Sequence, residues 1–134
     1  FQWAPFAQVS ALNEARRMIN RSLAREGGIR VSFDVPKWAY VQALLSLGDR
    51  RAGGLLLNAH RFNGDWKKAF KYSDVNPDFF VYRSKDFDER FPWDFLDHGI
   101  RKSFLKKEYL LALEGKESEA CRTGDCTRCG VCVP

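Results

Sequence analysis

The chain has 134 residues, of which 45% are hydrophobic and 29% charged, with a formal net charge of +5. This is the composition of an ordinary globular domain, which excludes wholesale disorder, and the small charge excess permits an anionic partner without requiring one. No signal peptide is visible, and no apolar run approaches the roughly 20 residues of a membrane span, so we expect a cytoplasmic protein with no membrane partner.

The N-terminal part predicts one helix and one strand. The chain begins at Phe1 without an initiator Met, which suggests a piece excised from a longer protein; a processed mature N-terminus is the alternative. A helix is then predicted, ended by Gly27-Gly28. Its apolar face carries Val9, Leu12, Ala15, Ile19 and Leu23, and its opposite face carries the stripe Arg17, Arg21 and Arg25. Residues 29–33 alternate apolar and polar and are rich in β-formers, so they are the best strand candidate.

The rest of the chain predicts further helices. Asp34 and Pro36 predict the start of a helix, because Asp is a common N-cap residue and Pro suits the first turn. The expected buried face of this helix is Trp38, Val41, Leu44 and Leu45. More helices are predicted over about 50–60 (capped by Asp49), 66–71, from Pro77 through Tyr82, and 101–114, the last covered on two faces. The fold class is therefore mainly α (α+β), with one or two strands. A lone strand needs partners, and we expect these upstream of the chain.

The cysteines carry the strongest chemical signal. All four lie in the last 14 residues, at Cys121, Cys126, Cys129 and Cys132, with the spacing C-x4-C-x2-C-x2-C. A disulfide scaffold would spread its cysteines through the fold. A C-x2-C step instead lets two thiolates converge on one centre. Gly124 and Gly130 would help the chain to reverse, and Arg122 and Arg128 would lower the pKa values of the thiols.

Two ligands fit this spacing. Compact runs such as C-x2-C-x2-C favour an iron–sulfur cluster, which one short segment can wrap. Structural zinc sites usually place two C-x2-C steps a dozen or more residues apart, so zinc is the alternative. The third interpretation is a tail that binds no ligand or is redox-active.

Other polar and aromatic residues give weaker signals. His60 is expected to interact with a helix C-terminus, and His98 to orient on Asp94 or Asp97, neither with an assigned role. The arginine stripe favours a solvated helix face over a phosphate site. The tryptophans are expected to be core anchors, because they do not alternate with Arg or Lys along one strand. A nucleic-acid partner is therefore not favoured.

Several motifs occur in an order that resembles a known family. They are Phe1-Gln2-Trp3, Gly28-Ile29-Arg30-Val31-Ser32, Gly48-Asp49-Arg50-Arg51, residues 92–99 (Pro-Trp-Asp-Phe-Leu-Asp-His-Gly), Phe104-Leu105-Lys106-Lys107-Glu108-Tyr109, Ala112-Leu113-Glu114-Gly115 and the terminal Cys-Gly-Val-Cys. The whole chain resembles the C-terminal part of a bacterial family of radical S-adenosylmethionine (SAM) proteins with a B12-binding-like N-terminal region, often called Fe–S oxidoreductases.

The resemblance implies a division into three parts. Residues 1–62 would end a partial (β/α) barrel, with Ile29–Phe33 as a barrel strand and Phe1-Gln2-Trp3 continuing another. Residues 63–116 would form a helical extension and 117–134 the cysteine tail. Upstream domains of the same polypeptide would be the partner, binding SAM and cobalamin in the full-length protein only. The chain lacks the C-x3-C-x2-C motif of that family, so it should not cleave SAM by itself.

Two functions are therefore predicted. In the first, the chain is the C-terminal portion of a radical SAM enzyme, and Cys121, Cys126, Cys129 and Cys132 ligate an auxiliary iron–sulfur cluster. In the alternative, it is a helical binding module with a zinc-clipped tail that docks RNA or a partner protein. The substrate, the reaction and the catalytic residues are left unassigned.

Overall fold

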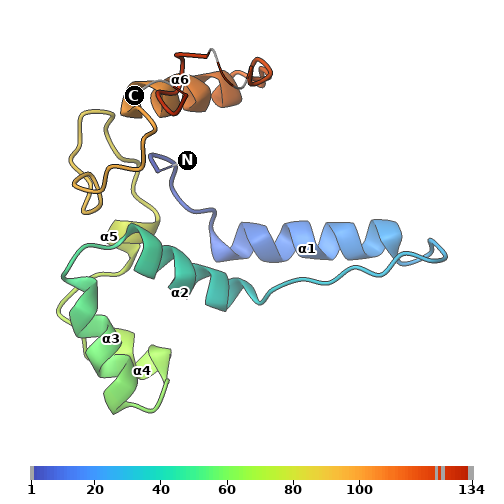
Figure 1. The fold of residues 1–134 in the computed structure, drawn as a ribbon. Coiled ribbons are helices and arrows are strands. Elements are labelled where there is room, and N and C mark those ends of the chain that lie inside the picture. Colours follow the sequence, from blue (N-terminus) through green and yellow to red (C-terminus); the bar gives the residue numbers. More distant parts are fainter. Residues whose placement is uncertain (1, 123, 125, 133–134) are drawn as a thin grey trace. The chain divides into compact units, whose positions relative to one another are not determined.

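The computed structural model describes residues 2–122, 124 and 126–132, and its regular elements are helices (Figure 1). The helices are α1 (Val9–Leu23), α2 (Pro36–Leu47), α3 (Ala52–Arg61), α4 (Trp66–Lys71), α5 (Asp78–Val81) and α6 (Lys102–Leu113). The predicted class, mainly α, is confirmed. Within the described residues, no helix combines the length and the apolar character needed to cross a membrane.

The expected strands are not formed. Residues 29–33 have no regular secondary structure, and the described part of the chain contains no strand that could pair with them. Ile29 and Phe33 are exposed, so the alternating pattern has no sheet and no core to bury its apolar side. Gln2 and Trp3 lie in a turn, which corrects the second expected strand, and its first residue, Phe1, lies outside the described residues.

The chain divides into two compact units. The first, which we call the helical unit, is Ala4–Lys85 and holds α1 to α5. The second, which we call the tail unit, comprises Phe1–Trp3 and Asp86–Pro134 and holds α6 and the cysteines. Each unit has its own buried centre.

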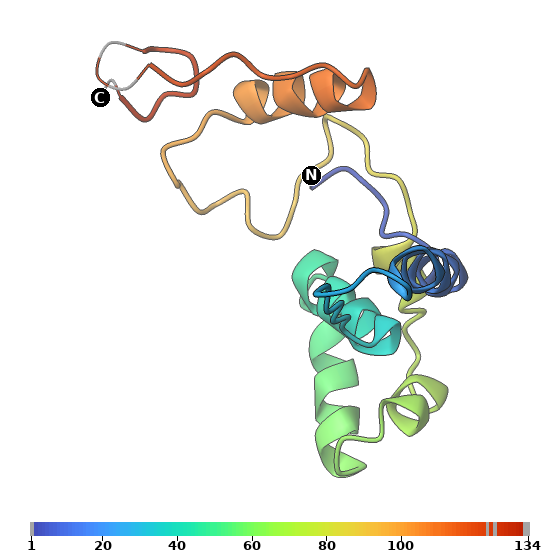
Figure 2. The same cartoon turned by 90° about the vertical axis from the view of Figure 1, so that its right-hand side faces the viewer.

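The core of the helical unit lies where α2, α3 and α5 meet. Leu44, Leu55 and Val81 are fully buried there, together with Ala43 and Phe80. Helix α2 contacts α5 and α1, and α3 contacts α4 (Figure 2).

The predicted buried face of α2 is half right. Val41 and Leu44 are buried as expected, whereas Trp38 and Leu45 are exposed. The elements packed on α2 cover only the side that carries Val41, Ala43 and Leu44, so an apolar residue beside this side stays in solvent.

Most helix boundaries follow local signals in the sequence. The bounds of α4 are those predicted, and Asp65 caps this helix by accepting a hydrogen bond from the backbone N–H of Lys68 at 3.1 Å. Pro36 occupies the first turn of α2, but the N-cap is Val35 and not Asp34, which corrects that prediction. Helix α1 ends at Leu23, before Gly27, and none of its residues is buried.

The centre of the tail unit is aromatic. Trp3 is buried, as predicted for a core anchor, and its ring lies 5.4 Å from that of Phe87 and 5.7 Å from that of Tyr109. Phe91 completes the group at 6.4 Å. Helix α6 contributes Tyr109 but has no fully buried residue. Phe104 and Leu111 on one predicted face, and Leu105 and Tyr109 on the other, are half-buried, so both faces are covered only in part.

Candidate metal centre

The four cysteines lie in a loop that follows α6 in the tail unit. All four are free thiols; Cys121 is exposed, and Cys126, Cys129 and Cys132 are half-buried. Gly124 and Gly130 both have positive φ, at +107° and +98°. Residues other than glycine rarely adopt this conformation, so the two positions suit the predicted reversal of the chain. Thr123 and Asp125, between the first two cysteines, lie outside the described residues.

The loop is held against the start of α6. The backbone N–H of Arg101 donates to the carbonyl oxygen of Cys129 at 2.8 Å, and the Arg101 guanidinium donates to the carbonyl oxygen of Thr127 at 3.2 Å. Gly130 lies so close that a Cβ there would meet the Gly99 carbonyl oxygen at 3.1 Å. The cysteine loop is therefore anchored at residues 127–130, next to a rigid helix.

One thiol is biased towards its thiolate form. The Arg128 Nε donates to the Sγ of Cys126 at 3.4 Å, and this hydrogen bond, helped by the backbone N–H of Arg128, lowers the pKa of the Cys126 thiol. Arg128 is itself fixed, because its guanidinium also donates to Glu119 at 2.5 Å and to the Ala120 carbonyl oxygen at 2.8 Å. The predicted effect of arginine on the thiols is thus seen for Arg128.

The donor set fits a metal in its chemistry. It offers four thiols within twelve residues, and the lowered pKa of Cys126 favours the thiolate, the form that binds iron and zinc. Among the residues that the structure describes, however, no three His, Cys, Asp or Glu side chains come together in a way that could hold a metal ion. Ligation by three or four of these cysteines therefore requires the loop to close around the ion.

A cavity of about 370 Å³ lies beside the anchor of the cysteine loop. Its lining includes Trp93, Phe95, Asp97, His98, Ile100 and Lys102. The cysteine loop contacts Gly99 and Arg101. The segment 97–102 therefore contacts the cysteine loop and also lines the cavity. In the sequence, only the resemblance and His98 drew attention to this segment, because no motif marks a cavity.

Polar contacts fix the shape of this cavity. The Lys102 Nζ lies 2.7 Å from Asp94 Oδ2, and this oxygen also accepts a hydrogen bond from the Phe91 N–H at 2.9 Å. Both contacts lower the pKa of Asp94, the lysine contributing most. Trp93 Nε1 donates to Gln2 Oε1 at 3.2 Å. The ends of the segment 91–102 are therefore tied together.

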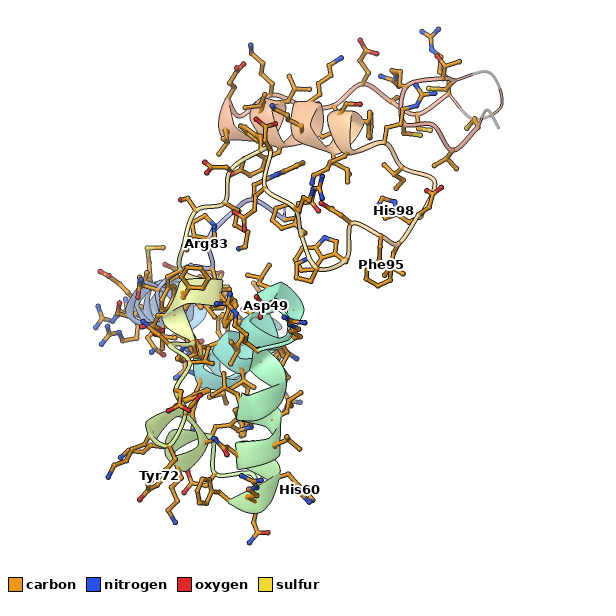
Figure 3. All side chains as sticks on the ribbon, turned by 90° about the vertical axis from the view of Figure 1, so that its left-hand side faces the viewer. Asp49, His60, Tyr72, Arg83, Phe95 and His98 are labelled. Carbon is orange, nitrogen blue, oxygen red and sulfur yellow. The ribbon has the colours of Figure 1, made fainter. Side chains whose placement is uncertain are left out.

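The two histidines take up different positions. His98 Nδ1 accepts a hydrogen bond from the Ile100 N–H at 3.2 Å, in place of the expected contact with Asp94 or Asp97. Since Nδ1 accepts, the neutral ring carries its proton on Nε2 and can donate there. His98 shares its loop with the exposed Phe95 (Figure 3). His60 lies in the last turn of α3, the position predicted for a partner of the helix dipole.

Comparisons with known proteins identify no relatives. No protein-family model matches the chain, and neither a curated protein nor a solved structure matches it. The resemblance to the radical SAM family therefore stays a prediction that rests on the motifs of the sequence.

Proposed function

We propose that the chain is the C-terminal portion of a cytoplasmic radical SAM iron–sulfur enzyme, and that its tail unit binds an auxiliary cluster. Cys121, Cys126, Cys129 and Cys132 would be the ligands. The observation that carries the proposal is the anchored cysteine loop, in which the Arg128 side chain donates to the Cys126 Sγ and lowers the pKa of that thiol.

The role of the site follows from the number of its ligands. Four thiolates occupy all four irons of a cubane cluster, which leaves no iron open for a substrate. A cluster held in this way supplies electron transfer or structural stability. The chain's own residues would hold it, with Arg128 offsetting the charge of the thiolates and Arg101 fixing the loop on α6.

The rest of the enzyme would be supplied by other parts of the polypeptide. The chain has four cysteines and no C-x3-C-x2-C motif, so SAM cleavage would belong to an upstream domain with its own cluster, and cobalamin to the B12-binding-like region. The cavity beside the loop gives the tail unit a place for a small molecule or a chain segment near the cluster. Free thiols accord with a reducing, cytoplasmic environment.

Anaerobic reconstitution of the purified chain with iron and sulfide tests the proposal. We expect about four iron and four sulfide per chain, visible absorbance and a paramagnetic signal after reduction. Cys129→Ser should lower the iron content, whereas Thr127→Ser, which keeps every thiol, should not. If the protein instead contains one zinc per chain and shows no visible absorbance, the site is a structural zinc site and the cluster proposal is rejected. Unchanged iron content in Cys129→Ser would remove the proposed ligand set.

A further inference from the structure

The positive charge of the chain is concentrated in the helical unit. Residues 4–85 contain 14 Lys and Arg against 7 Asp and Glu, a formal net charge of +7. The remaining residues, which form the tail unit, contain 8 against 10, a net charge of −2. The modest total of +5 therefore hides a strongly basic unit, and a basic unit attracts polyanions.

Exposed aromatic rings in this unit are paired with cations. Lys37 Nζ lies 5.6 Å from the ring centroid of Trp38, and Lys71 Nζ lies 5.7 Å from that of Tyr72. The third ring, Phe79 on α5, has the Arg51 guanidinium at 5.4 Å. The rings of Trp38, Tyr72 and Phe79 belong to residues that are 48%, 62% and 45% exposed. These pairs combine a flat apolar surface with a positive charge, both open to a ligand.

Two of these rings lie at opposite ends of α3. Arg51 precedes α3 and stands over Phe79, whereas Tyr72 packs on Phe62, directly after α3, at 5.4 Å between centroids. Figure 3 shows Asp49, which binds Arg51, and Tyr72 at the two ends of this helix. Ten helical residues separate the two ends by about 15 Å. A flexible strand of several nucleotides can span this distance.

Further contacts hold the cations in place. Asp49 accepts from Arg51 Nε at 2.9 Å and lies 2.7 Å from its NH2, so the guanidinium loses little conformational freedom when it binds a phosphate. Near Tyr72, α4 exposes Lys67, Lys68 and Lys71 over little more than one turn. The Tyr72 end of α3 therefore offers three lysines, and the Phe79 end offers Arg51 together with Arg83, whose guanidinium lies 4.7 Å from the Phe79 ring centroid.

We propose that the helical unit binds a single strand of nucleic acid. Bases would stack on Tyr72 and Phe79, and phosphates would pair with the neighbouring lysines and arginines. Stacking on a side chain requires bases that are not already stacked in a duplex, so the exposed rings favour a single strand. An acidic protein would use the charges but would leave these rings without a matching surface. The tail and its metal take no part in this binding.

Fluorescence anisotropy of the full chain with a labelled 20-nucleotide oligouridylate tests the proposal, with the matching oligothymidylate as a second strand. We expect the chain to bind at least one of the two oligonucleotides, with an affinity that falls steeply as the salt concentration rises. Tyr72→Leu and Phe79→Leu should each weaken it about tenfold, because each removes one stacking platform. The control Phe95→Leu removes an 81% exposed ring of the tail unit and should leave the affinity unchanged. Circular dichroism of each variant checks that the helices are retained.

The charge contribution is tested separately. Lys67→Gln combined with Lys71→Gln should reduce the slope of log affinity against log salt by about 1.4, since each single-strand phosphate contact adds about 0.7. Lys107→Gln combined with Lys116→Gln in the tail unit should leave the slope unchanged. Unchanged affinity of Tyr72→Leu and Phe79→Leu for both oligonucleotides would overturn the proposal, as would tighter binding to a duplex or to phosphatidylserine vesicles. Oligonucleotide binding should persist after a chelator has removed any metal from the tail unit. This result shows that the nucleic-acid proposal does not depend on the cluster proposal.

Discussion

The backbone N–H of Arg101 and the carbonyl oxygen of Cys129 are joined by a hydrogen bond of 2.8 Å. This bond ties the middle of the cysteine loop to the residue that precedes α6, 28 positions earlier in the chain. A backbone contact of this kind does not depend on the Arg101 side chain, although its guanidinium adds a second bond, to Thr127. The position of the loop is therefore set by main-chain geometry, which substitutions at Gly130 should disturb most.

Gly130→Ala should weaken metal binding more than Gly124→Ala. Both positions have positive φ, so alanine strains the backbone at either one by about 1–2 kcal/mol. At Gly130 the new Cβ would also meet Gly99 and Arg101 at 3.0–3.2 Å, whereas at Gly124 no other part of the described chain lies within 4 Å of it. Titration of each variant with zinc measures the affinity. Equal losses in the two variants would show that the anchored position of the loop does not matter.

Cys126 should be the most reactive of the four thiols in metal-free protein. The Arg128 side chain lowers the pKa of Cys126, so its thiolate persists at a lower pH than that of an ordinary cysteine, whose pKa is about 8.5. Alkylation by iodoacetamide between pH 6 and 9, followed by peptide mass spectrometry, gives the rate at each cysteine. Arg128→Gln should move the profile of Cys126 to higher pH, and Arg122→Gln should not. A profile of Cys126 that is unaltered by Arg128→Gln would contradict this account.

The ion pair of Asp94 with Lys102 should stabilise the tail unit only above acidic pH. Since the folded protein lowers the pKa of Asp94, the contribution is complete above the unfolded value of about 3.9 and is lost as pH falls through the folded value. Both side chains are partly exposed to solvent, which screens the pair, so Asp94→Asn should cost less than about 1 kcal/mol at pH 7. Urea unfolding at pH 7 and pH 3 measures this, with Asp88→Asn as control. If Asp94→Asn lowers the free energy of unfolding equally at pH 7 and pH 3, the ion pair is not the cause of the loss.

Helices could be predicted here because their signals are local. The bounds of α4 follow from the Asp65 cap and the turn before it, and Pro36 marks the start of α2. The cysteine loop was also visible, because ligand spacing and turn glycines are written in consecutive residues. Each of these features is determined by residues that are adjacent in the sequence, so the sequence is enough to predict it.

Features that depend on distant partners could not be predicted in this way. Residues 29–33 have the pattern of a strand but no partner in the described chain, so the pattern does not become a sheet. The exposure of Trp38 depends on which side of α2 is covered. The contact of Arg51 with Phe79 joins residues 28 apart in sequence, so the sequence showed no pairing of aromatic and basic residues there. The cavity beside the cysteine loop likewise arises only from the fold.

Leu55→Ala should destabilise the helical unit far more than Leu57→Ala on the same helix. Leu55 is fully buried between α2 and α5, so its truncation removes apolar contacts and leaves a cavity, at a cost of about 2–5 kcal/mol. Leu57 is exposed, and its truncation should change the free energy of unfolding by less than about 0.5 kcal/mol. Both variants alter helix propensity alike, so their difference in urea unfolding isolates the effect of burial. Similar losses would mean that this core does not hold the unit together in solution.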